Sequence, residues 1–152
     1  MSPSAKPSGG WGRGADPPEE PPRLQLVVYA EPAAVPIVRH RLRAWLETLA
    51  WPEPDLDDVL MAVNEACTNA IEHAYPLANP GYVMIDGSLA RVGNGRHVTV
   101  IVQDRGRWRP APAESGFRGY GITVMRGCMH TVNIEPSPDG TSLTLISFAV
   151  AG

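Results

Sequence analysis

Apolar residues recur at intervals of three and four in two stretches of the chain, the spacing that puts them on one face of an α-helix. The first stretch runs through residues 35–49 and predicts a helix of about 17 residues that Pro32 can open, since proline is tolerated in a first turn. The Trp-Pro-Glu-Pro segment at residues 51–54 predicts a break. A second helix is then predicted, with Asp55 as its N-cap and its end at Pro76.

Short β-rich runs account for most of the remaining periodic sequence. Gly93-Asn94-Gly95 joins two of these runs, and Asn-Gly between such runs is a strong hairpin signal. The Ser-Pro-Asp-Gly segment at residues 137–140 predicts a turn between the last two. The predicted strands cover residues 24–29, 82–89, 97–103, 131–134 and 141–150.

A third helix is predicted for residues 119–129, after a loop at residues 105–118 that is rich in Arg, Pro and Gly. The predicted order is therefore β-α-α-β-β-α-β-β. Hairpin-linked strands favour a mainly antiparallel sheet, with the three helices gathered on one face. The predicted fold class is α+β, a two-layer α/β sandwich.

Composition separates the first 23 residues from the rest, because they hold six prolines and four glycines. Such a segment buries too little apolar surface to offset the entropy lost on ordering. We expect a disordered tail at residues 1–23 and one domain at residues 24–150. A tail that folds on a partner through Trp11 is the alternative.

Charge and cysteine usage exclude several classes of function. The 152 residues include 13 Lys and Arg against 16 Asp and Glu, a net charge of -3, which disfavours direct binding of nucleic acid. The two cysteines cannot form a disulfide framework, and no signal peptide is recognised. The longest apolar run falls short of the roughly 20 residues of a membrane helix. We expect a cytoplasmic protein that does not bind membranes.

Polar residues in the second helix are the first candidates for chemistry. Glu65, Asn69 and His73 are four residues apart, so they stack along one line outside the apolar stripe. A carboxylate and an amide oxygen one turn apart suit a hard cation such as Mg²⁺, and the glutamate could also accept a proton. Zinc is not expected, because Cys67 faces another way. A solvated polar face explains each residue singly.

Two further features lie next to predicted strand ends. Asp104 follows a strand and could accept a hydrogen bond from a ligand's amino group, while Gly106 permits close backbone approach. Thr141 opens the last strand and could contact a ligand through its hydroxyl. Ordinary turns would contain the same residue types.

The third helix opens on Arg118-Gly119-Tyr120-Gly121-Ile122. Free backbone N–H groups and the helix dipole at such a position favour a phosphate, and Arg118 adds positive charge. A helix cap with an ordinary loop glycine would produce the same pattern.

Together these features come in an order and spacing that resembles the GHKL ATPase superfamily, whose members include gyrase and the histidine kinases. The sequence is most similar to its branch of anti-sigma-factor serine kinases (RsbW- and SpoIIAB-like). Residues 64–75, NEACTNAIEHAY, look like the N box of that branch, and residues 121–125, GITVM, look like its G2 box. The resemblance covers about residues 24–150.

The resemblance implies a role for each matching residue. Asn69 would hold Mg²⁺, Glu65 would be the general base, and Asp104 would bind the adenine amino group. Arg39, in the first helix, falls where the family has an arginine at its partner-binding surface. The residues expected to contact the nucleotide and its metal are Asn69, His73, Asp104, Gly106, Arg118, Gly119, Gly121, Ile122 and Thr141.

The function implied is that of an anti-sigma factor and serine kinase that uses ATP and Mg²⁺ to phosphorylate a STAS-domain antagonist. A sigma factor and a second copy of the chain are the other expected partners. The sequence departs from the family in two places. Trp108 stands where the family's G1 box, which begins at Asp104, often has a second glycine, and the lid segment between Asp104 and Gly119 is short. The alternative is a non-catalytic module that sequesters a sigma factor or other regulator, which would need no base at Glu65.

Overall fold

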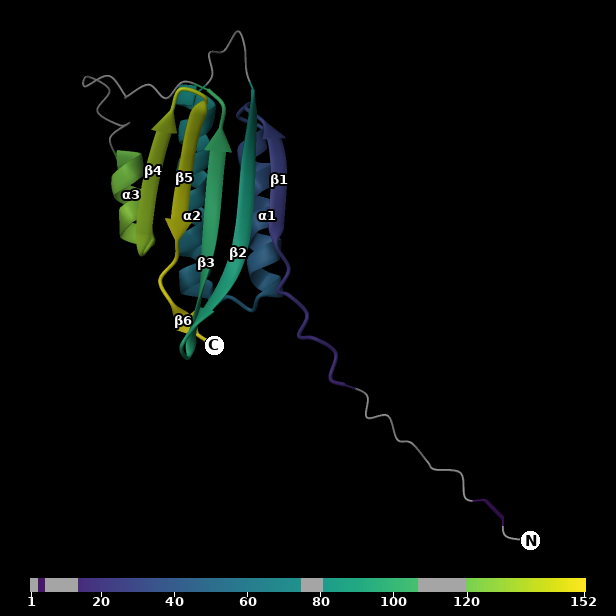
Figure 1. Ribbon diagram of the computed structural model, residues 1–152. Coiled ribbons are helices and arrows are strands. Elements are labelled where there is room, and N and C mark those ends of the chain that lie inside the picture. The colour runs from purple at the N-terminus through teal and green to yellow at the C-terminus, as the bar shows by residue number, and fades with distance from the viewer. Residues whose placement is uncertain (1–2, 5–13, 75–80, 107–119) are drawn as a thin grey trace.

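A six-stranded antiparallel sheet forms one layer of the protein, and helices cover one of its faces (Figure 1). The computed structural model describes residues 3–4, 14–74, 81–106 and 120–152, apart from the side chains of residues 73, 74 and 120. This architecture confirms the predicted α+β sandwich. The elements are β1 Leu24–Tyr29, α1 Ala34–Thr48, α2 Glu53–Asn69, the π-helical η1 Ala70–Ala74, β2 Tyr82–Val92, β3 Gly95–Asp104, α3 Tyr120–Cys128, β4 Thr131–Ser137, β5 Gly140–Ile146 and β6 Val150–Ala151.

Strand β3 occupies the middle of the sheet. The strand order is β1-β2-β3-β5-β4, and β6 pairs with the beginning of β3. The β2–β3 hairpin closes at the pair Val92 and Gly95, so its turn is Gly93-Asn94, with Gly93 at a φ of 58°. A positive φ suits glycine, and this confirms the predicted hairpin.

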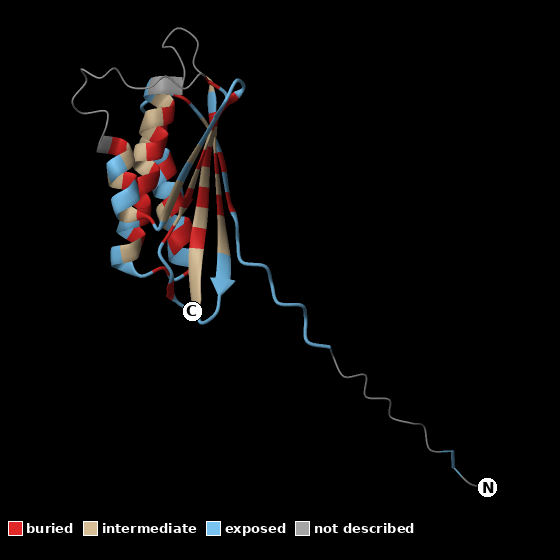
Figure 2. Cartoon of the chain, turned by 60° about the vertical axis from the view of Figure 1, so that its left-hand side comes forward, coloured by how far each residue is buried: buried red, intermediate tan, exposed pale blue. Residues whose placement is uncertain are grey.

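The hydrophobic core lies between the sheet and the helices, and buried residues occur in both layers (Figure 2). Every second residue of β3 from Val98 to Asp104 faces this core. Leu46 of α1 and Val63 of α2 meet it from the helical layer. The alternation of β3 therefore directs Asp104, its last residue, towards the helices rather than solvent. No helix of the described residues is long and apolar enough to span a bilayer.

Helix α2 begins earlier than the sequence predicts. Its first residue is Glu53 and its N-cap is Pro52, so the prediction that Asp55 caps the helix is wrong. Pro54 lies within the first turn, where its missing N–H has no helical partner to lose. At its other end, α2 gives way at Ala70 to the π-helical turn η1. The predicted end at Pro76 lies outside the described residues.

The last predicted strand is divided in two. Strand β5 ends at Ile146, and β6 resumes at Val150. The physical reason is Ser147, whose buried Oγ accepts a hydrogen bond from the Val98 N–H at 3.0 Å in place of a regular ladder contact. The prediction of one continuous strand at residues 141–150 is therefore wrong.

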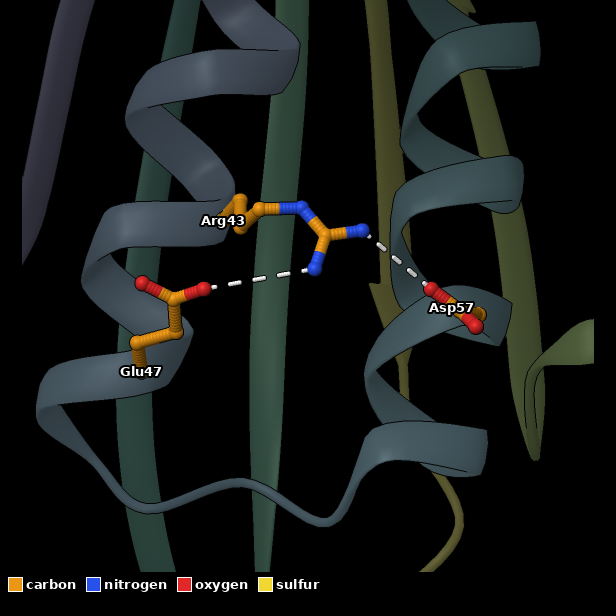
Figure 3. Close-up of polar contacts among 3 residues, drawn as sticks. All are labelled: Arg43, Glu47 and Asp57. Atoms are coloured by element: carbon orange, nitrogen blue, oxygen red, sulfur yellow. Dashed lines mark hydrogen bonds and ion pairs between the residues drawn. The ribbon is translucent and has the colours of Figure 1, made fainter.

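Polar contacts tie α1 to α2 along their exposed sides. Arg43 of α1 lies between Glu47 on its own helix, at 4.0 Å, and Asp57 on α2, at 3.3 Å (Figure 3). All three side chains are largely exposed, so these ion pairs contribute little to stability. Packing of the apolar stripes holds the two helices together.

Gly87 of β2 makes room for the ring of Trp45. A Cβ at Gly87 would lie 2.9 Å from two ring carbons of Trp45 and 3.0 Å from the Leu24 Cβ. The ring cannot move aside freely, because it is buried and its Nε1 donates a hydrogen bond to the Pro22 carbonyl at 2.7 Å. Gly87 is thus required by close packing of α1 on the sheet.

Replacing Gly87 by valine should destabilise the protein, even though valine is the better strand former. Overpacking of this kind costs about 1–3 kcal/mol, which urea denaturation would measure. The control is Ser88→Val, which places the same side chain on the opposite face of β2. Equal stability of the Gly87 variant and the control would show that the Trp45 ring is free to shift.

Candidate functional site

Asp104 ends β3 and points into the protein with only 9% of its surface exposed. Its Oδ1 accepts hydrogen bonds from the backbone N–H groups of Gly106, at 3.0 Å, and Thr141, at 3.3 Å. Neither of these bonds uses Oδ2. The carboxylate is therefore held in one orientation by its own chain, with a second oxygen that can serve a ligand.

Burial raises the pKa of the Asp104 carboxyl above its ordinary value, while the hydrogen bonds from Gly106 and Thr141 oppose that rise. Desolvation disfavours the charged form, and the backbone donors stabilise it. A ligand that needs the carboxylate as an acceptor will therefore bind less well as the pH falls. The decrease in affinity will begin at a higher pH than it would if the ligand were bound by an exposed aspartate.

Thr141 lies beside Asp104 in the register of β3 and β5. Its Oγ1 is buried and has no hydrogen-bond partner among the described residues. A buried hydroxyl without a partner costs free energy, so this atom is one that a bound polar group would satisfy. Asp104 and Thr141 together offer an acceptor and a hydroxyl at one end of the sheet.

Gly140 brings these two residues together. Its φ is 139°, a conformation that other residues rarely adopt, and a Cβ there would overlap the Asp104 carbonyl oxygen and lie 2.7 Å from the Arg105 Cα. The sequence identified residues 137–140 as a turn but not this close approach. A glycine directly before a predicted strand is the sequence signal that could have found it.

Glu65 and Asn69 form the second half of the site, on α2. Both are half-buried, and both approach Gly121, the second residue of α3. A Cβ at Gly121 would lie 3.2 Å from Glu65 Oε2 and 3.2 Å from Asn69 Nδ2. The structure thus brings together three residues that the sequence selected from separate segments.

The two halves lie in different layers at the same end of the sandwich. Helix α2 and strand β3 run in the same direction, and both end near the top of Figure 1. Contacts between η1 and β3 join the two layers at that end. The side-chain oxygen atoms of Glu65 and Asn69 on α2 therefore lie on one side of the site, and the Asp104–Thr141 pair lies on the other.

Several other residues that the sequence predicted for the site either have different surroundings or lie outside the described residues. Ile122 is half-buried and packs against the hydrophobic core. His73 lies in η1, so the even α-helical spacing from Glu65 ends at Asn69, and its side chain is not among those described. Arg118 and Gly119 lie outside the described residues, as does Trp108.

Arg39 connects the surface of α1 to the site helix. Its Nη2 donates a hydrogen bond to Asn64 Oδ1 at 2.7 Å, and Asn64 immediately precedes Glu65. Sequence reasoning selected Asn69 but passed over Asn64. Asparagine is a poor helix former, so an asparagine within a helix often has a specific partner, and that criterion would have found both residues.

Comparison with known proteins identifies the family of this chain. Residues 28–147 fit the family described as the histidine kinase-like ATPase domain, a range that contains every candidate site residue. The chain belongs to the histidine kinase-like ATPase family. Membership implies use of ATP, as the sequence resemblance predicted.

Relatives place the chain in the anti-sigma-factor serine kinase branch of the family. Serine-protein kinase RsbW of Bacillus subtilis is 36% identical over 123 residues, which are 74% of this chain and 77% of that protein. Serine-protein kinase RsbW of Bacillus velezensis is 27% identical over 136 residues, 82% of this chain and 84% of that protein. The anti-sigma F factor of Clostridium acetobutylicum is 35% identical over 95 residues, 53% of this chain and 61% of that protein.

A solved structure shows the same ATPase fold. The crystal structure of the RsbU and RsbW domains of a Mycobacterium tuberculosis protein matches with a TM-score of 0.68 and 26% sequence identity. The match covers 84% of this chain and 32% of that one, so this chain spans about a third of its length.

The residues present fit a nucleotide with a divalent cation. The unpartnered Thr141 Oγ1 and the buried Asp104 suit the polar edge of a base. Glu65 and Asn69 supply the carboxylate and amide oxygens that Mg²⁺ prefers. The described residues contain no group of three or more His, Cys, Asp or Glu side chains that could hold a metal ion.

Proposed function

We propose that this ATPase domain is an anti-sigma factor that transfers the γ-phosphoryl group of Mg·ATP to a serine hydroxyl of a STAS-domain antagonist. The observation that carries the proposal is the meeting of Glu65, Asn69 and Gly121 at the end of the sandwich where Asp104 and Thr141 lie. The names of the relatives support the kinase and anti-sigma roles.

Binding of the nucleotide follows from the sheet side of the site. Asp104 Oδ2 accepts a hydrogen bond from the adenine amino group, because Oδ1 is already engaged by Gly106 and Thr141. The Thr141 hydroxyl gains the partner that it lacks. Both contacts are made to the base, so they hold ATP and ADP alike.

Transfer of the phosphoryl group depends on α2. Asn69 presents its amide oxygen to Mg²⁺, which when bound neutralises charge on the phosphate oxygens. Glu65 accepts the serine proton as the serine oxygen bonds to the γ-phosphorus and the bond to the β-phosphate oxygen breaks, releasing ADP. Chemistry of this kind is mainly positioning and electrostatic stabilisation.

Partner binding is assigned to α1. Arg39 is exposed and lies one hydrogen bond from Asn64, so a partner that engages Arg39 contacts the helix that carries Glu65. We expect a STAS-domain antagonist and a sigma factor to share this surface. The family resemblance also leads us to expect a homodimer.

Incubation with γ-labelled ATP and a STAS-domain protein from a neighbouring gene tests the proposal. We expect label on one serine of the STAS protein and none after that serine is replaced by alanine. Tight ATP binding without transfer to any STAS partner would instead favour the nucleotide-dependent binding module. Failure to bind ATP would contradict both functions.

The Asp104→Asn variant should bind ATP and ADP about 10- to 100-fold more weakly, since a hydrogen bond to a charged group is worth about 1.5–3 kcal/mol. Asparagine keeps an oxygen for Gly106 and Thr141 but turns an N–H₂ group towards the adenine amino group. Asp104→Ala should lose stability as well, because two buried N–H groups lose their acceptor.

Calorimetric titration with ADP measures this change, and Asp139→Ala, an exposed aspartate in the nearby turn, is the control. An ADP affinity unchanged in Asp104→Asn would remove Asp104 from the nucleotide site.

A further inference from the structure

Gly121 occupies an unusual place in α3. It is buried, and the polar ends of two α2 side chains converge on the position that its Cβ would take. Glu65 Oε2 and Asn69 Nδ2 both lie 3.2 Å from that position, and Asn69 Oδ1 lies 3.5 Å from it. Separations of 3.2 Å are tighter than nine in ten real Cβ contacts.

The backbone of α2 cannot withdraw to relieve such a contact. Its opposite face is fixed in the core by buried residues, among them Leu60, Val63 and Cys67. Interiors are close-packed, so a helix held in this way transmits a new contact rather than absorbing it. A methyl group at position 121 would therefore displace the ends of Glu65 and Asn69.

We propose that Gly121 is a positioning residue, whose missing side chain leaves the space in which the Glu65 carboxylate and the Asn69 amide lie together beside α3. The importance of this role for catalysis rests on the proposed function. It is separate from a backbone N–H contact with phosphate, which an alanine at position 121 would keep.

Gly127 provides a matched control within the same helix. A Cβ at Gly127 would meet nothing within 4 Å. Alanine is the better helix former at both positions, so propensity alone favours both substitutions equally. Gly127→Ala should raise the Tm by a few degrees, whereas Gly121→Ala should not, because the gain is offset by the new contacts.

The first test uses the ligand-free protein, where phosphate plays no part. The side-chain amide signals of Asn69 in a ¹H–¹⁵N NMR spectrum should shift in Gly121→Ala and stay in place in Gly127→Ala. Unshifted Asn69 signals in a folded Gly121→Ala protein would overturn the proposal.

A double-mutant cycle gives an independent readout. In a Glu65→Ala background one of the two neighbours is gone and only the Asn69 contact remains, so Gly121→Ala should there change the Tm more favourably than it does in the wild type. The same Tm change with and without Glu65 would also overturn the proposal. This cycle remains informative if Gly121→Ala alone folds poorly.

Nucleotide binding then separates this proposal from the proposed function. Calorimetry with ADP should show that Mg²⁺ tightens binding to the wild-type protein and that Gly121→Ala loses most of this increment. The metal-free ADP affinity should change less than about threefold, since the Asp104 side is untouched. A wild-type protein that ignores Mg²⁺ would contradict the proposed function, while the NMR and Tm results still decide the packing role of Gly121.

Discussion

Replacing Asn69 by alanine should abolish phosphoryl transfer and remove the Mg²⁺ dependence of ATP binding. Asn69 is the last residue of α2, and its amide lies against Gly121 with the Glu65 carboxylate beside it. In the proposed mechanism its oxygen would be the neutral ligand that holds the cation, which would offset charge on the phosphates. Without it, the nucleotide keeps only its backbone and adenine contacts, and no detectable label should reach the STAS partner.

The substitution should leave the fold almost unchanged. Alanine is the better helix former by no more than about 0.7 kcal/mol, and Asn69 is only half-buried. Thermal unfolding without ligand checks this expectation. Asn64→Ala is the matched control, because it removes an asparagine from the same helix but should keep the Mg²⁺ dependence. Unfolding of Asn69→Ala at ambient temperature would show that Asn69 is a structural residue.

The Glu65→Gln variant should bind Mg·ATP almost as tightly as the wild type but phosphorylate the antagonist at least about a hundredfold more slowly. Glutamine keeps the size and most of the hydrogen bonding of glutamate but cannot accept a proton. General base catalysis typically contributes 10²- to 10⁴-fold, and this contribution is lost from the transition state alone. Single-turnover transfer with a matched STAS partner measures the rate.

Glu72→Gln removes a negative charge from the following turn and serves as the control for a general change in charge. It should transfer phosphate at a rate close to that of the wild type. Equal rates for Glu65→Gln and the wild type would show that Glu65 is not the base.

Hydrophobic spacing predicted the type of each main element, because burial of one face dictates the periods of helices and strands. It predicted their ends less well. Pro54 suggested a break yet lies in the first turn of α2, and Ser147 interrupts a run that looks continuous in sequence. The start of α2 reflects the tolerance of a first turn for proline, and the break at Ser147 reflects a single hydrogen bond, and spacing reveals neither.

The candidate site was found through residue types rather than geometry. Asp104, Glu65 and Asn69 stood out as polar residues beside strand ends or within a helix. Their arrangement needed the structure, because it depends on which elements meet. Gly121, Gly140 and Gly87 show this most clearly, since each admits a specific neighbour from another element where a side chain would collide.

The position of the two chain ends has a practical consequence. Pro22 is hydrogen-bonded to Trp45 just before β1, and β6 pairs with the beginning of β3, so both ends leave the sandwich opposite Asp104 (Figure 1). The ten residues of β3 span roughly 30 Å, which is the separation between the β6 pairing and Asp104. A surface anchor or a fused module at either terminus would therefore leave the proposed nucleotide site uncovered, and tethered single-molecule assays of this domain become feasible.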